Sequence, residues 1–271
     1  MKDILVHIDD SPRATVRLEI AIELTKRLDG RLTGLFARIE SHRPSAVTHQ
    51  ASPALAAARA NGESLFRART AAAGIAARWW QLSHGEPGHV LSETMFCARF
   101  ADLVVMGQPE PGRRVVPARL VEHVILQCGR PVLVIPHAGD FATVGERIAI
   151  AWNAGRGAVR ALNDAKPLLR HARSVTVLSL RTPPHGDAAL PFEVPQVDIL
   201  DHLAINGIAA ESERLAGEDI GKMDMLLSRA CDLGADLVVM GTHGSEGLSL
   251  QRGRGTRFVL EQMTVPVLMS N

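Results

Sequence analysis

The sequence is poor in cysteine and in net charge. Its 271 residues include 3 cysteines, Cys97, Cys128 and Cys231, which lie far apart and form no Cys-x-x-Cys pair. This usage excludes a disulfide framework and is typical of a reducing compartment. The 30 Lys and Arg residues nearly balance the 29 Asp and Glu residues. We therefore expect no broad basic surface of the kind that binds nucleic acid or an anionic membrane.

Long apolar runs and metal motifs are also missing. No apolar run approaches the ~20 residues that cross a bilayer, and the residues after Met1 form a strand pattern rather than a signal peptide. A cytoplasmic protein is expected, with neither nucleic acid nor membrane as a partner. The 11 histidines are scattered, and none lies in a His-Glu-x-x-His motif or a zinc-type Cys/His spacing. No metal site is predicted.

One seven-residue stretch occurs twice. Ala-Asp-Leu-Val-Val-Met-Gly spans residues 101–107 and again residues 235–241. Each copy is a short apolar run closed by glycine, which is typical of a buried parallel strand. Such runs alternate with helical segments as βαβαβαβαβ in each half, which predicts two α/β domains, each an open parallel sheet covered by helices. The expected domains span residues 1–138 and 146–271.

The chain in order gives the expected elements. Ser11 should cap the first helix, with Pro12 at its first helical position. The expected helices are 12–28, 53–73, 90–100, 118–127, 158–171, 197–205, 219–233 and 256–263. The expected strands are 4–8, 32–39, 75–82, 103–106, 131–135, 148–152, 174–180, 209–214, 237–240 and 265–269.

The second copy of the repeat runs into a glycine-rich segment. Its glycines are Gly241, Gly244, Gly247, Gly253 and Gly255. Glycine adopts positive φ readily and lets the backbone approach a ligand closely. A strand that leads through such a loop into a helix presents backbone N–H groups and a helix N-terminus to an anion. The segment predicts an anion or nucleotide site, and a plain surface loop is the alternative reading.

The same segment differs from better-known motifs. No Gly-Lys-Ser/Thr follows a glycine loop, so it is not a P-loop, and 253–255 lacks the third glycine of a dinucleotide fingerprint. His243 stands where a nucleophile elbow needs glycine before Ser245, which argues against acyl transfer. Thr256 is placed to cap the next helix and to donate to a phosphate.

The layout resembles a tandem universal stress protein, a family of α/β adenine-nucleotide-binding-like domains. The family's phosphate motif is Gly-x2-Gly-x9-Gly-Ser/Thr, followed by a helix and a closing Val-Pro-Val-Leu strand. Gly241 and Gly244 match the first two glycines, residues 265–268 match the closing strand, and Gly253 takes the third glycine. The loop is then one residue short, and Arg254 stands where the family has Ser or Thr. Both departures count against an intact ATP site.

The resemblance implies an adenine-nucleotide site in the second domain. Asn153 follows the first strand of that half, where the family usually has an Asp that lies against the adenosine; Asp9 keeps the acid in the first half. Either residue could equally cap a turn. The expected nucleotide-binding residues are Asn153, Gly241, Gly244, Ser245, Gly253, Arg254, Gly255 and Thr256. Arg252, Arg254 and Arg257 read equally well as phosphate contacts or as a solvated helix start.

The first half lacks the glycine loop. Gln108-Pro109-Glu110-Pro111 follows Gly107, and we place Pro111 at the position of the second glycine. Pro109 has no N–H to donate, and Glu110 brings a negative charge to the expected phosphate position. The first domain is therefore expected to be mainly structural, and any bound ligand is expected in the second half only.

Two functions of different classes follow. The first is a stress-response regulatory protein that binds ATP, ADP or AMP in its second domain, with no catalytic residue and at most slow ATP hydrolysis. The alternative is a scaffold or protein-interaction module of the same fold that binds no nucleotide. The two halves are expected to pair through their closing strands as a pseudo-dimer, or the chain to form a homodimer.

Overall fold

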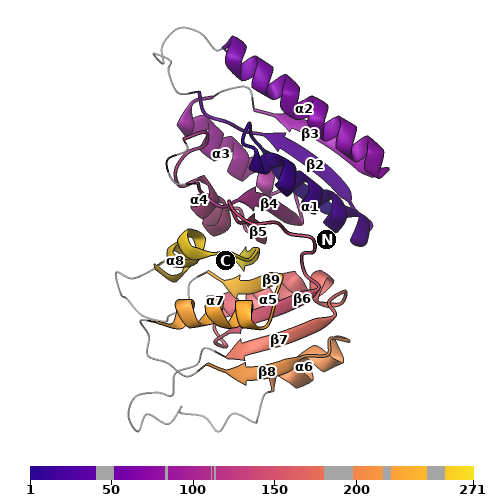
Figure 1. Cartoon of the computed structure of the whole chain (residues 1–271), viewed down its shortest axis with the longest axis vertical. Helices are drawn as coiled ribbons and strands as arrows, with labels where there is room; N and C mark the ends of the chain where they lie inside the picture. The colour runs from indigo at the N-terminus through magenta and orange to yellow at the C-terminus, as the bar shows by residue number, and fades with distance from the viewer. Residues whose placement is uncertain are drawn as a thin grey trace. The chain divides into compact units, whose positions relative to one another are not determined.

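The computed structural model describes residues 1–40, 52–82, 85–110, 112, 114–179, 198–215, 221–242 and 254–271. The chain divides into two compact units (Figure 1). Unit 1 comprises Met1–Ala142 together with Met269–Asn271, and unit 2 comprises Thr143–Leu268.

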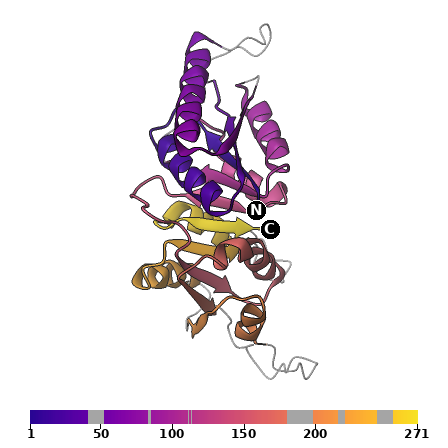
Figure 2. The ribbon, with the colours of Figure 1, turned by 90° about the vertical axis from the view of Figure 1, so that its right-hand side faces the viewer.

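Unit 1 is a parallel sheet with helices on both faces. Its strands are β1 (Asp3–Ile8), β2 (Arg31–Phe36), β3 (Ala76–Gln81), β4 (Leu103–Gly107) and β5 (Val132–Ile135), and its helices are α1 (Arg13–Arg27), α2 (Pro53–Ala73), α3 (Pro87–Ala98) and α4 (Leu120–Gln127). The strand order is β3-β2-β1-β4-β5, with parallel pairing throughout. Helix α1 contacts α2 and α3 contacts α4, and the two pairs cover opposite faces (Figure 2).

Unit 2 repeats this plan. Its strands are β6 (Arg147–Trp152), β7 (Ser174–Ser179), β8 (Glu211–Arg214), β9 (Leu237–Gly241) and β10 (Val267–Ser270), and its helices are α5 (Arg156–Leu169), α6 (Ile199–Ile205), α7 (Lys222–Asp232) and α8 (Arg254–Gln262). The order β8-β7-β6-β9-β10 matches that of unit 1 strand for strand. Ile4 pairs with Leu103 as Ile148 pairs with Leu237, so the register repeats as well. The α/β class with two repeated parallel sheets is confirmed.

The repeated strand forms the centre of each core. Residues Leu103 to Met106 of β4 and Leu237 to Met240 of β9 are all buried, because helices cover both faces of a parallel sheet. The edge strand β8 is short and polar, with the sequence Glu-Ser-Glu-Arg. Such a strand discourages pairing with another chain.

Two predicted helix caps are wrong. Helix α1 begins at Arg13, with Pro12 at the N-cap and no side-chain capping bond. The Ser11 hydroxyl instead donates to Asp9 Oδ1 at 2.5 Å, because a buried carboxylate is a stronger acceptor than the role of cap would offer. Helix α8 begins at Arg254, which places Thr256 within its first turn rather than at the cap.

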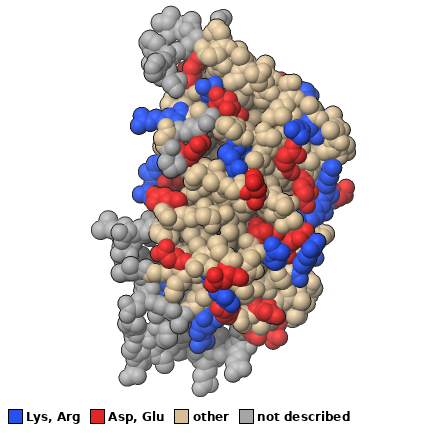
Figure 3. All heavy atoms as spheres, viewed as in Figure 1, with Lys and Arg blue, Asp and Glu red and all other residues tan. Residues whose placement is uncertain are grey.

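The surface and the cysteines add little chemistry. Basic and acidic side chains are interspersed on the face drawn in Figure 3, as the balanced composition predicts. The three cysteines are free. Within the described ranges, no helix combines the length and apolarity needed to span a bilayer, and no group of three or more His, Cys, Asp or Glu side chains is arranged to hold a metal ion.

Candidate functional site

The strand order of each unit changes direction at one point. In unit 1 that point lies between β1 and β4, and in unit 2 between β6 and β9. Ligands of open α/β sheets bind outside the carboxyl ends of the strands at such a point. Asp9 and Gly107 stand there in unit 1, and Asn153 and Gly241 in unit 2. The fold therefore brings together two of the predicted nucleotide-binding residues, Asn153 and Gly241.

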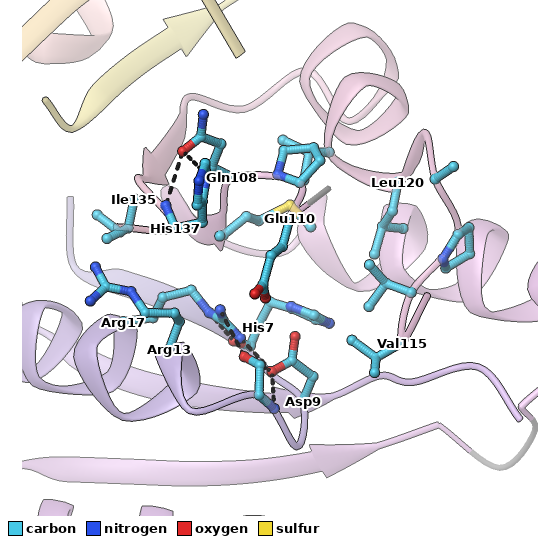
Figure 4. Close-up of a pocket in the computed structure, with 18 of the residues that line it drawn as sticks. His7, Asp9, Arg13, Arg17, Gln108, Glu110, Val115, Leu120, Ile135 and His137 are labelled. Carbon is cyan, nitrogen blue, oxygen red and sulfur yellow. Dashed lines mark hydrogen bonds and ion pairs between the residues drawn. The ribbon is translucent and has the colours of Figure 1, made fainter. Parts of the chain in front are cut away.

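In unit 1 a buried ion pair fills this position. Arg17 Nη2 lies 2.8 Å from Asp9 Oδ1, and the two side chains are only 5% and 7% exposed. Arg17 Nε donates to the carbonyl oxygen of His7 at 3.2 Å. The backbone N–H of Ser11 donates to the same Asp9 oxygen at 2.9 Å. The charges of Asp9 and Arg17 thus compensate each other inside the protein (Figure 4).

The ion pair sets the protonation of its neighbours. Burial by itself raises the pKa of Asp9, but Arg17, His7 and the hydrogen bonds from Ser11 outweigh it and hold the pKa well below its usual range. His7 Nε2 donates to the carbonyl oxygen of Ala37 at 2.8 Å. Burial lowers the pKa of His7, and Arg17 lowers it further against the opposing effect of Asp9. At neutral pH the carboxylate is ionised and the imidazole is neutral.

A cavity of about 280 Å³ opens beside these residues. Its walls come from the carboxyl ends of β1, β4 and β5 and from the segment that leads into α4. The Glu110 carboxylate points toward His7 and Asp9 (Figure 4). On the β5 side, Gln108 Oε1 accepts from the backbone N–H of His137 at 2.9 Å.

Sequence reasoning missed His7, Arg17 and Gln108 as members of this site. Arg17 carried a detectable signal, because it lies three residues after Ala14 and four before Ala21 on the buried face of α1. An arginine on such a face needs a buried partner. His7 and Gln108 carried no comparable signal, since each directly adjoins an apolar run and reads as a strand end.

Unit 2 replaces the ion pair with small neutral residues. Counting from the equivalent positions Ile4 and Ile148, Asn153 corresponds to Asp9 and Ala161 to Arg17. Asn153 Oδ1 accepts from the backbone N–H of Gly155 at 2.9 Å. Asn153 therefore caps a turn, and its exposed side chain lies at the end of β6.

Close packing explains the glycine at the end of each repeated strand. A Cβ atom on Gly107 would lie 2.6 Å from Arg17 Nη1, and one on Gly241 would lie 2.1 Å from the carbonyl carbon of Gly157, in the first turn of α5. In unit 1 the arginine side chain lies against the strand end. In unit 2 the helix backbone itself does so, which brings the N-terminus of α5 against β9.

The register corrects one assignment in the first-half loop. Leu103 and Leu237 hold equivalent positions, and counting on from them makes Glu110, not Pro111, the counterpart of Gly244. A carboxylate therefore occupies the position of the second motif glycine. This strengthens the argument that the loop of unit 1 is unsuited to phosphate.

The remaining predicted site residues are only partly described. Gly255 and Thr256 lie in the first turn of α8, where Thr256 is buried and a Cβ on Gly255 would lie 3.7 Å from Met223 Cγ. Gly244, Ser245, Gly253 and the side chain of Arg254 lie outside the described residues, and so does Arg252.

Comparison with known proteins places this fold. Among solved structures, a universal stress protein from Archaeoglobus fulgidus DSM 4304 shares 18% identity over 99% of this chain and 98% of its own, with a TM-score of 0.72. A putative universal stress protein from Pseudomonas aeruginosa UCBPP-PA14 shares 18% identity over 100% of this chain and 93% of its own, with a TM-score of 0.57. The cytoplasmic domain of a prokaryotic cation chloride cotransporter shares 12% identity over 99% of this chain and 94% of its own, with a TM-score of 0.52. At these identities the likeness concerns the fold alone.

The family follows from the sequence match. No curated protein matches the chain at a significant level. The model of the universal stress protein family matches residues 1–136, half of the chain. The chain belongs to the universal stress protein family.

Proposed function

We propose that this chain is a stress-response regulatory protein that binds an adenine nucleotide at the carboxyl ends of β6 and β9 in unit 2. The observation that carries the proposal is the contrast between the two strand-end sites. Unit 1 fills its site with the Asp9–Arg17 ion pair, whereas unit 2 has Asn153 and Ala161 at the equivalent positions.

Charge favours a phosphate in unit 2 over unit 1. In unit 1, a phosphate would meet Glu110 and Asp9, and the one buried cation, Arg17, already compensates Asp9. Two like charges about 4 Å apart repel by roughly 1 kcal/mol in water and about 4 kcal/mol at an effective dielectric near 20. The counterparts in unit 2 are Asn153 and Gly244, which carry no charge.

Backbone donors support the same assignment. The first turn of α5 lies against Gly241, and α8 begins at Arg254, directly after the glycine-rich segment. Helix N-termini direct unpaired N–H groups and a partial positive charge at an anion. The adenine nucleotide is chosen over other anions because the chain belongs to this family and retains the two glycines Gly241 and Gly244.

Calorimetry on a matched pair of variants tests the proposal. Wild type should bind ATP, ADP or AMP with measurable heat, and Gly244→Val should abolish binding, because a β-branched side chain resists positive φ and occupies the space of a phosphate. Glu110→Val makes the same new side chain at the equivalent position of unit 1 and should leave binding unchanged. Loss of binding in Glu110→Val with retention in Gly244→Val would place the ligand in unit 1 and contradict the proposal.

A second candidate is a protein-interaction module that binds no nucleotide. The short loop between Gly244 and Gly253 and the arginine at position 254 favour it. Absence of heat from wild type with millimolar ATP, ADP and AMP would decide for this module and against the nucleotide.

A further inference from the structure

Unit 1 carries a second cavity, away from the carboxyl ends of β1 and β2. Its volume is about 540 Å³. Its polar members are Asp3 and Arg31, which begin β1 and β2, and Arg78 on β3. We call it the aromatic groove, lined by Asp3, Arg31, Arg78, Trp80, Phe96, Cys97 and Phe100.

The groove exists because the two faces of β3 are covered unequally. Trp79 packs against Phe66 of α2, with ring centroids 5.3 Å apart. Trp80 is the next residue along the strand, so its side chain points to the opposite face and lines the groove. There α3 ends in Phe96 and continues to Phe100, whose rings meet edge to face with centroids 5.2 Å apart.

The aromatic side chains of the groove are unusually exposed. Phe96 and Phe100 expose 58% and 59% of their surface. A soluble protein rarely leaves adjacent large aromatic side chains in water, and such patches mark binding sites. The cavity volume falls within the range of about 300–1,000 Å³ that is usual for small-molecule pockets, which are mostly apolar with a few polar groups.

Arg78 supplies the polar group. Its guanidinium lies over the Trp80 ring, 4.2 Å from the centroid. Its Nη2 reaches Thr33 Oγ1 at a long 3.4 Å, and its Nε has no hydrogen-bond partner. Arg31, by contrast, pairs with Asp3. No carboxylate in the described part of the chain forms an ion pair with Arg78.

We propose that the aromatic groove binds a small planar aromatic carboxylate. The aromatic ring of the ligand lies among Trp80, Phe96 and Phe100, where offset and edge-to-face ring contacts are favourable. The carboxylate pairs with Arg78, because a planar guanidinium matches a carboxylate in two parallel hydrogen bonds. This site is separate from the strand-end site of unit 2, and its ligand needs no phosphate.

Titration with 2-naphthoate and its neutral isostere 2-naphthamide tests the proposal. Calorimetry should show one naphthoate per chain, bound about tenfold or more tightly than naphthamide, as expected for one charge-assisted contact. Arg78→Gln should remove this preference and leave naphthamide binding intact, whereas loss of packing alone would weaken both probes. Arg78→Lys keeps the charge without the planar fork and should retain part of the preference.

The aromatic walls are tested with a matched control. Phe96→Ser and Phe100→Ser should weaken both probes, and their exposure predicts that folding is kept. Ile205→Ser removes an apolar side chain that is 88% exposed on α6 and should change neither probe. Circular dichroism checks the fold of each variant.

Four results would overturn the proposal. They are equal affinity for the two probes, no saturable binding at millimolar naphthoate, displacement of naphthoate by AMP, and self-association of the chain that Phe96→Ser abolishes. The AMP result would assign the probe to the nucleotide site, and self-association would assign the groove to a second copy of the chain.

Discussion

Removing Arg17 should expose the cost of the buried ion pair in unit 1. Arg17→Ala leaves the Asp9 side chain, which is 7% exposed, without its cation. Removing one partner of a buried pair typically costs about 3–5 kcal/mol. The hydrogen bonds from Ser11 to Asp9 remain in the variant, so we expect the lower end, about 3 kcal/mol.

Unit 2 suggests how to recover that loss. Asp9→Asn combined with Arg17→Ala recreates the residues found at Asn153 and Ala161. Because the double variant leaves no buried charge unpaired, its destabilisation should be smaller than the sum of the two single values by about 2–3 kcal/mol.

The pH dependence gives an independent check. The pKa of Asp9 is depressed in the folded protein, so the stability it contributes is present above its unfolded pKa of about 3.9 and is lost as the pH falls through the folded pKa. In Arg17→Ala, burial raises the pKa of Asp9 with no opposing arginine. The acid-side loss of stability should therefore begin at a higher pH than in wild type.

Urea unfolding measures these differences in unit 1 alone. In a Trp152→Phe background, the remaining tryptophans of the chain, Trp79 and Trp80, both lie in unit 1, so their fluorescence reports its unfolding. A coupling free energy below about 0.5 kcal/mol, which is the level of independent sites, would refute the account of the ion pair.

Three further predictions concern packing, pH and the ligand. Gly241→Ala should destabilise unit 2 by at least about 3 kcal/mol in calorimetric melting because its Cβ would meet the α5 backbone at 2.1 Å, whereas Gly255→Ala, in a helix with 3.7 Å to its nearest neighbour, should cost nothing or stabilise slightly; equal effects would contradict the packing argument. Because the pKa of His7 is lowered in the folded protein, stability should fall as the pH drops from about 6.5 toward that folded pKa, by up to about 1.4 kcal/mol per unit, and urea titrations at pH 7.5 and 5.5 should show less of this loss in His7→Gln. Arg254→Ala should weaken nucleotide binding by about 1.5–3 kcal/mol if its guanidinium contacts phosphate, and unchanged affinity in calorimetry would exclude that contact.

The fold was predictable because its strongest signals are local. The repeated Ala-Asp-Leu-Val-Val-Met-Gly predicted β4 and β9, and both strands are buried where the apolar runs stand. Pro53 preceded by Ser52 marks the start of α2, where Ser52 accepts from the backbone N–H of Leu55. Composition and spacing within one segment suffice for such features.

The strand-end site of unit 1 depends on tertiary partners and was not predictable in the same way. Asp9 read as a turn cap, but Arg17, eight residues on, reaches back to it from α1. Ser11 read as a helix cap for the same local reason, and the buried carboxylate takes its hydroxyl instead. The alternation of Trp79 and Trp80 indicates two faces, but only the packed helices decide which face stays open.

Photoaffinity labelling with 2-azido-ATP tests the central claim most directly, because it locates the bound nucleotide within the chain. After cross-linking, mass spectrometry of the digested protein identifies the labelled peptides, with excess ATP as competitor. The account predicts labelling in unit 2, on peptides containing Asn153 or residues 235–256, that unlabelled ATP suppresses. Suppressible labelling on a peptide containing Asp9 or Glu110, or no suppressible labelling anywhere, would contradict it.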